Sequence, residues 1–145
     1  MKAHNFNVRN AVELRSGSRT LDLRGDYLFE SAFYDATNAA VSLHWRSTRL
    51  GPREDLVLYF EGVKRFQVDS TSAIGASEIE PSDTGSLNCI GFIRDDPSAS
   101  WPVIMDEPPP EEWAWRFEFD SGCTYLIDAY TVRLEIASRE RSAIN

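Results

Sequence analysis

The sequence predicts an all-β fold, a single-domain antiparallel β-sandwich, on three observations. Apolar residues recur at every second position far more often than at the helical spacing. Val, Ile, Tyr, Phe, Trp and Thr, which favour strands, are concentrated in short segments. Turn-forming residues separate these segments at intervals of about eight to twelve residues, which favours antiparallel hairpins. The same spacing also allows a flattened β-barrel.

The clearest predicted strand covers 113–120, where aromatic residues alternate with smaller or charged ones. Trp113, Trp115, Phe117 and Phe119 share one face of this strand, so that face is expected to be buried. Segments 40–46 and 130–137 alternate in the same way, and we expect the three strands to form much of the core. Their predicted core residues are Val41, Leu43, Trp45, Tyr130, Val132, Leu134 and Ile136. The other predicted strands are 11–15, 20–24, 27–35, 56–60, 63–68, 86–94 and 124–128.

Asp128 interrupts the apolar pattern near the end of the chain. If 124–136 ran as one strand, Asp128 would share a face with Leu126, Val132 and Leu134. An unpaired carboxylate is costly in such a place. We therefore predict a bend or bulge near Ala129, which would turn the carboxylate away, in preference to a functional buried acid.

A chain of 145 residues is long enough for one domain, because folding at this size buries about two-thirds of the unfolded surface. We expect 1–145 to form that domain, with a polar tail at 138–145 that frays. The longest uncharged runs have ten residues, fewer than the roughly 20 that cross a membrane. No signal-peptide pattern opens the sequence, so we expect a cytoplasmic protein without a membrane partner.

The few cysteines and histidines limit the metal and redox chemistry. In a cytoplasmic protein, Cys89 and Cys123 are predicted to be reduced core thiols and not a disulfide. Together with His4 and His44 they make a poor zinc set, and no calcium-loop spacing is present. We predict neither a metal nor a cofactor.

Negative charge is concentrated in one part of the sequence. The chain has 23 acidic and 15 basic residues, a net charge of -8. Residues 78–120 hold eleven acids and two bases, while the remainder is close to neutral. This segment would repel a phosphate backbone, which argues against a nucleic-acid partner. It either keeps the protein soluble or forms a surface that steers a basic partner.

Residues 95–112 contain five of the seven prolines and are predicted to form a long acidic loop. Proline lacks the N–H that a sheet ladder requires, and ordered loops of this length are often functional. An exposed Trp101 among carboxylates would anchor a partner by burial of its ring. The predicted binding residues are Asp95, Asp96, Trp101, Asp106, Glu107, Glu111 and Glu112.

The usual catalytic and nucleotide-binding motifs do not occur in this sequence. A serine or cysteine nucleophile needs a histidine base, but His44 is expected on the outward face of its strand and His4 near the chain end. We predict no catalytic residue. Two alternatives stay open: a carbohydrate- or small-ligand-binding sandwich that uses Trp101, and an enzyme with a site at His44 or Asp128.

Three segments carry a resemblance to a group of known proteins. They are LVLYFEGV at 56–63, FEFDSG at 117–122 and YLIDA at 125–129. This pattern resembles small uncharacterised bacterial β-sandwich proteins, some of which look like immunity proteins of polymorphic toxin systems. The resemblance implies a toxin-neutralising role, in which an acidic protein occludes a basic active site.

These observations together predict a non-enzymatic, protein-binding domain. Its acidic loop would engage lysine or arginine residues of a basic protein partner and block that partner sterically. Formation of homo-oligomers through an exposed strand edge is compatible with this function.

Overall fold

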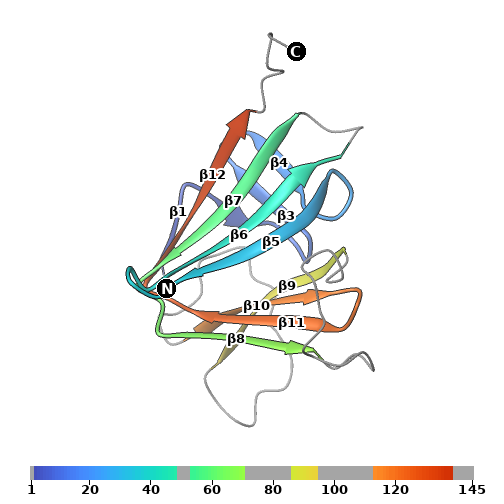
Figure 1. The fold of residues 1–145 in the computed structure, drawn as a ribbon. Coiled ribbons are helices and arrows are strands. Elements are labelled where there is room, and N and C mark those ends of the chain that lie inside the picture. The colour runs from blue at the N-terminus through green and yellow to red at the C-terminus, as the bar shows by residue number, and fades with distance from the viewer. Residues whose placement is uncertain (1, 49–52, 71–85, 95–112, 139–145) are drawn as a thin grey trace, which may run out of the picture.

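The computed structural model describes residues 2–48, 53–70, 86–94 and 113–138. In these ranges the chain forms β-strands and no helix, and the strands make three sheets (Figure 1). None of the three sheets closes on itself, and two large ones face each other. The prediction of an all-β sandwich is therefore confirmed. No helix that is long and apolar enough to cross a membrane occurs in the described ranges.

The first large sheet has five strands in the order β1-β12-β7-β6-β5. Neighbours are antiparallel except for β1, which runs parallel to β12. The strands are β1 (Lys2–His4), β12 (Thr131–Ser138), β7 (Glu54–Glu61), β6 (Ala40–Ser47) and β5 (Tyr27–Asp35).

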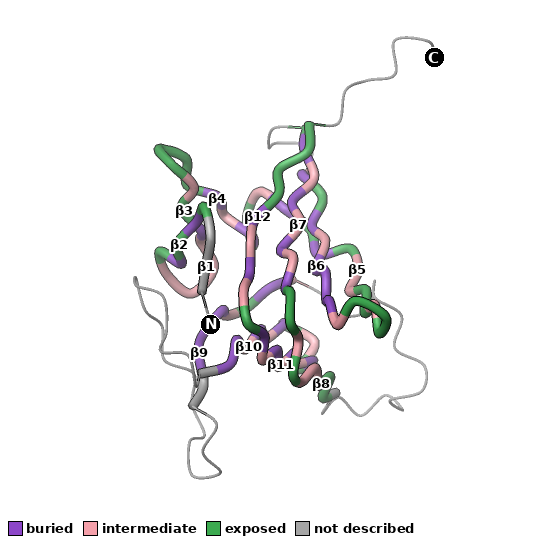
Figure 2. The backbone as a smooth tube through the Cα atoms, turned by 90° about the vertical axis from the view of Figure 1, so that its left-hand side faces the viewer, coloured by how far each residue is buried: buried purple, intermediate pink, exposed green. Residues whose placement is uncertain are grey.

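The second large sheet is fully antiparallel and has the order β8-β11-β10-β9. Its strands are β8 (Arg65–Ser70), β11 (Cys123–Asp128), β10 (Trp113–Phe119) and β9 (Leu87–Arg94). Figure 2 shows that β5 and β8 lie on one side of the sandwich, while β9 lies on the other.

A small third sheet lies against that other side and contains β2 (Asn7–Val8), β3 (Glu13–Ser16) and β4 (Arg19–Asp22). The backbone N–H of Ile90 in β9 donates to the carbonyl of Ala11 at 2.6 Å. The Asn5 side chain exchanges two hydrogen bonds with the backbone of Leu134 in β12. These bonds attach the N-terminal segment to both large sheets.

Aromatic side chains fill the space between the large sheets. Trp115 and Phe117 of β10 are buried, as the alternation of that strand predicts. Phe60 of β7 meets Trp115 edge-on at 5.9 Å between ring centroids, and Trp45 of β6 lies 6.2 Å from Phe117. Such offset and edge-on pairs are the favourable arrangements for aromatic rings. The other predicted core residues Phe119, Val41, Leu43, Val132 and Leu134 are also buried.

The core prediction is wrong for two residues, one just before β12 and one near its exposed end. Tyr130 precedes β12 and is 69% exposed, and Ile136 near its end is exposed as well. The sequence also did not reveal β1 and β2, which are too short to show an alternating pattern. The two cysteines are free, as predicted, with Cys123 buried and Cys89 half-buried.

The predicted break near Ala129 is confirmed. β11 ends at Asp128 in one large sheet and β12 begins at Thr131 in the other, so the chain crosses between sheets there. Asp128 lies half-exposed on the outer face, and the backbone N–H of Lys64 donates to its carbonyl at 2.7 Å. Residues 62–64 make the second crossing beside it, between β7 and β8.

Glycine at position 62 is required by this double crossing, which gives a matched test. Gly62 and Gly17 both have left-handed φ values, +63° and +60°. A Cβ added to Gly62 would lie 2.8 Å from the Cβ of Tyr130. A Cβ added to Gly17 would meet no atom within 4 Å. We expect Gly17→Ala to lower the free energy of unfolding by about 1 kcal/mol. Gly62→Ala is expected to cost at least about 1 kcal/mol more.

Urea unfolding of both variants measures these costs. A double-mutant cycle with Tyr130→Gly, which removes the clashing Cβ, should recover the extra cost at position 62. Equal costs at the two glycines would show that the contact with Tyr130 does not constrain the crossing.

Candidate functional site

The predicted acidic loop lies outside the described residues, together with all seven of its predicted binding residues. The two strands that flank it are described, and they fix where it starts and ends. Arg94 at the end of β9 pairs with Trp113 at the start of β10. Residues 95–112 therefore leave and re-enter the fold at adjacent positions of one sheet. The polar tail at 139–145 also lies outside the described residues.

The end of the sheet that holds Arg94 and Trp113 is also the end where the chain crosses between sheets. Trp115 pairs with Ile127 in β11, one residue before Asp128 at the crossing. The opposite end holds the turn 120–122 and the attachment points of residues 71–85, at Ser70 and Ser86. The topology thus attaches the acids of 95–112 to one end and those of 71–85 to the other.

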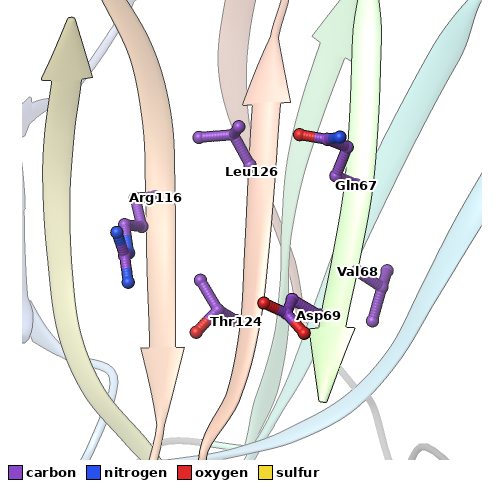
Figure 3. Close-up of a pocket in the computed structure, with 6 residues that line it drawn as sticks. All are labelled: Gln67, Val68, Asp69, Arg116, Thr124 and Leu126. Atoms are coloured by element: carbon purple, nitrogen blue, oxygen red, sulfur yellow. The ribbon is translucent and has the colours of Figure 1, made fainter. Parts of the chain in front are cut away.

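A groove with a volume of about 450 Å³ lies on the outer face of the four-stranded sheet. Figure 3 shows Gln67 and Asp69 of β8 on one wall, Arg116 of β10 on the other, and Thr124 and Leu126 of β11 between them. On β10 and β11 these side chains point outward because they alternate with inward-facing, buried residues, as Arg116 does with Trp115 and Phe117. Val68 also lines the groove but points away from the others (Figure 3).

The groove has both polar and apolar lining residues and carries both signs of charge, on Asp69 and Arg116. The guanidinium of Arg116 lies 3.0 Å from the carboxylate of Glu118, next to the groove. Cys89 faces Glu118 across the β9–β10 pair, and burial, aided by that carboxylate, raises the pKa of the thiol. A thiol with a raised pKa is a poor nucleophile at neutral pH. The groove has hydrogen-bond donors and acceptors for a polar ligand, but no activated nucleophile.

A partly buried ionic cluster joins the small sheet to the five-stranded sheet. Glu54 at the start of β7 is only 8% exposed, and its carboxylate accepts hydrogen bonds from the Arg19 guanidinium of β4 and from the Tyr27 hydroxyl of β5, the latter at 2.6 Å. The backbone N–H of Glu54 also donates to the Ser47 hydroxyl. We call Arg19, Tyr27 and Glu54 the triad; Tyr27 and Glu54 are buried, whereas the Arg19 side chain is largely exposed.

The ionisation states of the triad follow from its contacts. The Arg19 guanidinium holds the pKa of Glu54 below its ordinary value in opposition to burial, and the Tyr27 hydroxyl adds to this effect. Burial raises the pKa of Tyr27, and the hydrogen bond that it donates to Glu54 raises it further. The triad therefore holds a carboxylate, a guanidinium and a neutral phenol, a fully paired set that is structural.

The two residues considered for an enzyme are not brought together. His44 lies on the outer face of the five-stranded sheet, where its Nε2 is 2.9 Å from the Ser42 hydroxyl. Asp128 lies on the outer face of the other sheet. A serine–histidine pair needs an acid to orient the ring, and no described carboxylate bonds to His44. No cluster of three or more metal-binding side chains occurs among the described residues.

Comparison with protein-family models, with curated proteins and with solved structures found no match to this chain.

The triad was missed by sequence reasoning, although a signal was present. Leu56, Leu58 and Phe60 alternate along one buried face of β7, and Glu54 lies two residues before Leu56. Because β7 begins at Glu54, two residues earlier than predicted, Glu54 lies on the same face. A buried carboxylate then demands a basic partner. Nothing in the sequence indicated that the partner would be Arg19.

The triad predicts a specific pH dependence of stability. The pKa of Glu54 is lower in the folded than in the unfolded protein, so its contribution is complete above about pH 5 and is lost as the pH falls through the folded-state pKa. We expect Glu54→Gln to lower the free energy of unfolding by about 1–3 kcal/mol near neutral pH, with a smaller difference from wild type below about pH 4.

Urea unfolding of wild type and Glu54→Gln across this pH range tests the prediction. Glu135→Gln, which changes an exposed carboxylate that bonds to Arg133, is the matched control and should have little effect. A difference between wild type and Glu54→Gln that does not change with pH would contradict the assigned ionisation.

Proposed function

We propose that this protein is a non-enzymatic binding domain whose segment 95–112 engages a basic protein partner, as an immunity-like inhibitor does. The observation that carries the proposal is the pairing of Arg94 with Trp113. It ties both ends of a segment with six acids and no bases to one end of a well-packed sheet. Because the two ends of the segment are adjacent, its carboxylates belong to one region of the protein, and together they give a concentrated negative field.

The mechanism is electrostatic attraction followed by steric occlusion. The carboxylates of 95–112 accelerate encounter with a lysine- or arginine-rich surface, and the field of the net -8 chain adds to this. Trp101 lies among them in the sequence and supplies the apolar anchor that fixes the complex once formed. The partner's basic site is then covered by the acidic segment.

The described residues favour binding over catalysis. The buried Glu54 and Tyr27 are paired within the triad, burial raises the pKa of the thiols of Cys89 and Cys123, and no described carboxylate bonds to His44 of the Ser42–His44 pair. An acid–base catalyst needs a titratable group poised in a cleft. The groove of Figure 3 offers the Asp69 carboxylate, the Arg116 guanidinium and the Gln67 amide for contacts with a ligand.

The binding prediction is tested by reversing charge in the segment. The variant changes four acids to Lys: Asp95, Asp96, Asp106 and Glu107. We expect this variant to associate with a captured basic partner about tenfold more slowly, or slower still, at low salt. The association rate should also depend less on ionic strength than that of wild type. Stopped-flow or surface-based kinetics over a salt series measures both. A purely electrostatic role in association also predicts that the free energy of unfolding does not change.

The matched control reverses four acids of other elements that are not buried, Asp26, Glu61, Asp120 and Glu135, and so makes the same change in net charge. A position-specific effect appears only in the first variant. Equal rates for the first variant and wild type, or equal losses in the two variants, would remove the assignment to 95–112.

A second candidate function is binding of a carbohydrate or another small polar ligand, and the groove of about 450 Å³ favours it. Its walls carry the amide, carboxylate and guanidinium groups that hydrogen-bond hydroxyl-rich ligands. If the groove is the site, a sugar screen will show saturable binding by calorimetry that Arg116→Ala weakens about tenfold while Trp101→Ala does not. Loss of binding in Trp101→Ala alone would place the ligand on the loop instead.

A further inference from the structure

Exposed apolar side chains gather on the two strands that form one side of the sandwich. β5 and β8 are the terminal strands of their sheets, and no described strand pairs with their outer edges. Six large hydrophobic residues are exposed in the described part of the chain, and four of them lie on these two strands. The four residues are Leu28, Phe33, Tyr34 and Val68.

β5 and β8 lie close to each other across the open side. The ring of Tyr34 in β5 stacks on that of Phe66 in β8 at 6.1 Å, and Phe66 contacts the buried Tyr125 at 6.0 Å. Figure 2 shows both strands on the same side of the molecule. Phe66 and the half-exposed Val68 thus lie next to the free edge of β5.

β5 exposes an aromatic ring on each of its two faces. Phe33 pairs with Ser42 on the outer face and is 66% exposed, whereas Tyr34 pairs with the buried Val41 and is 50% exposed at the open side. A terminal strand with apolar side chains on both faces is a template for another strand, because one added strand covers both faces and satisfies the edge. The regular part of this edge is 31–35, since a bulge interrupts the register between Phe29 and Ser31.

The charge on this edge selects the occupant. β5 contains Glu30 and Asp35 and no basic residue, while neighbouring β8 carries one residue of each sign, Arg65 and Asp69, and adds no net charge. Antiparallel pairing of two β5 strands from two copies would bring acid near acid, which is unfavourable. A strand that carries lysine or arginine next to apolar residues satisfies both the edge and its carboxylates.

We propose that the outer edge of β5 is a strand-docking site, which takes an extended basic and apolar segment of a partner protein by β-strand addition. The segment's backbone would pair with 31–35. Its apolar side chains would lie beside Phe33 on one face and beside Tyr34 and Val68 on the other, with a basic side chain at Glu30. The site takes from the proposed function only the basic character of the partner and uses none of the residues in 95–112.

The test uses a synthetic peptide of alternating valine and lysine and amide chemical shifts of the ¹⁵N-labelled full chain. We expect saturable shifts confined to β5 and the facing residues of β8. A peptide with glutamate in place of lysine, and one methylated on alternate backbone nitrogens, should each bind at least about tenfold more weakly, because they lose the charge pair or the backbone hydrogen bonds. Shifts that map elsewhere, or equal binding of the three peptides, would overturn the proposal.

Variants separate this site from the acidic segment. Phe33→Ser should weaken peptide binding about tenfold and Glu30→Lys about fivefold. Glu135→Lys, an exposed charge reversal on β12, and the four-lysine variant of 95–112 should bind the peptide as wild type does. If only the 95–112 variant loses the peptide, the site is not on β5. A concentration-dependent dimer that Phe33→Ser dissociates would assign the edge to a second copy and would also overturn the proposal.

Discussion

Packing of aromatic rings between the two large sheets is the interaction on which the rest of the structure depends. Trp115 and Phe117 of β10 meet Phe60 and Trp45 of the opposite sheet, and all four rings are almost fully buried. Burial of each such side chain is worth about 1.5–3 kcal/mol, so the contact is the main force that holds the sheets face to face. Because the inner faces are used in this way, the outer faces, the free edges and the sheet ends are left for binding.

Polar contacts then fix how the other elements attach to this core. At one end the triad joins the small sheet to the five-stranded sheet through the buried Glu54, and at the other the crossings at Gly62 and Ala129 join the two large sheets. The acidic segment 95–112 starts and ends beside the crossings, where the backbone is held by both sheets. The open side between β5 and β8 lies away from the small sheet. The attachment points of 95–112, at the ends of β9 and β10, and the free edge of β5 therefore belong to different sheets of the same fold.

The sequence predicts the strands well because most of them alternate between a wet and a buried face. The prediction for 27–35 matches β5 at both ends, and the aromatic row of β10 is buried as expected. What it cannot predict is contact between elements far apart in the chain. The pairing of Glu54 with Arg19 and the stacking of Tyr34 on Phe66 depend on how sheets are arranged, and alternation does not specify this. Alternation also predicts Tyr130 in the core, but Tyr130 is exposed because the chain crosses between the sheets there and the alternation ends.

Amide hydrogen exchange of the protein with and without a captured basic partner tests the central claim most directly, because it reads every backbone position at once. The account predicts slower exchange within 95–112 and at the ends of β9 and β10 around Arg94 and Trp113, with the turn at 120–122 unchanged. Protection at 120–122 and none near Arg94 and Trp113 would contradict it, since the partner would then bind the opposite end of the sheet.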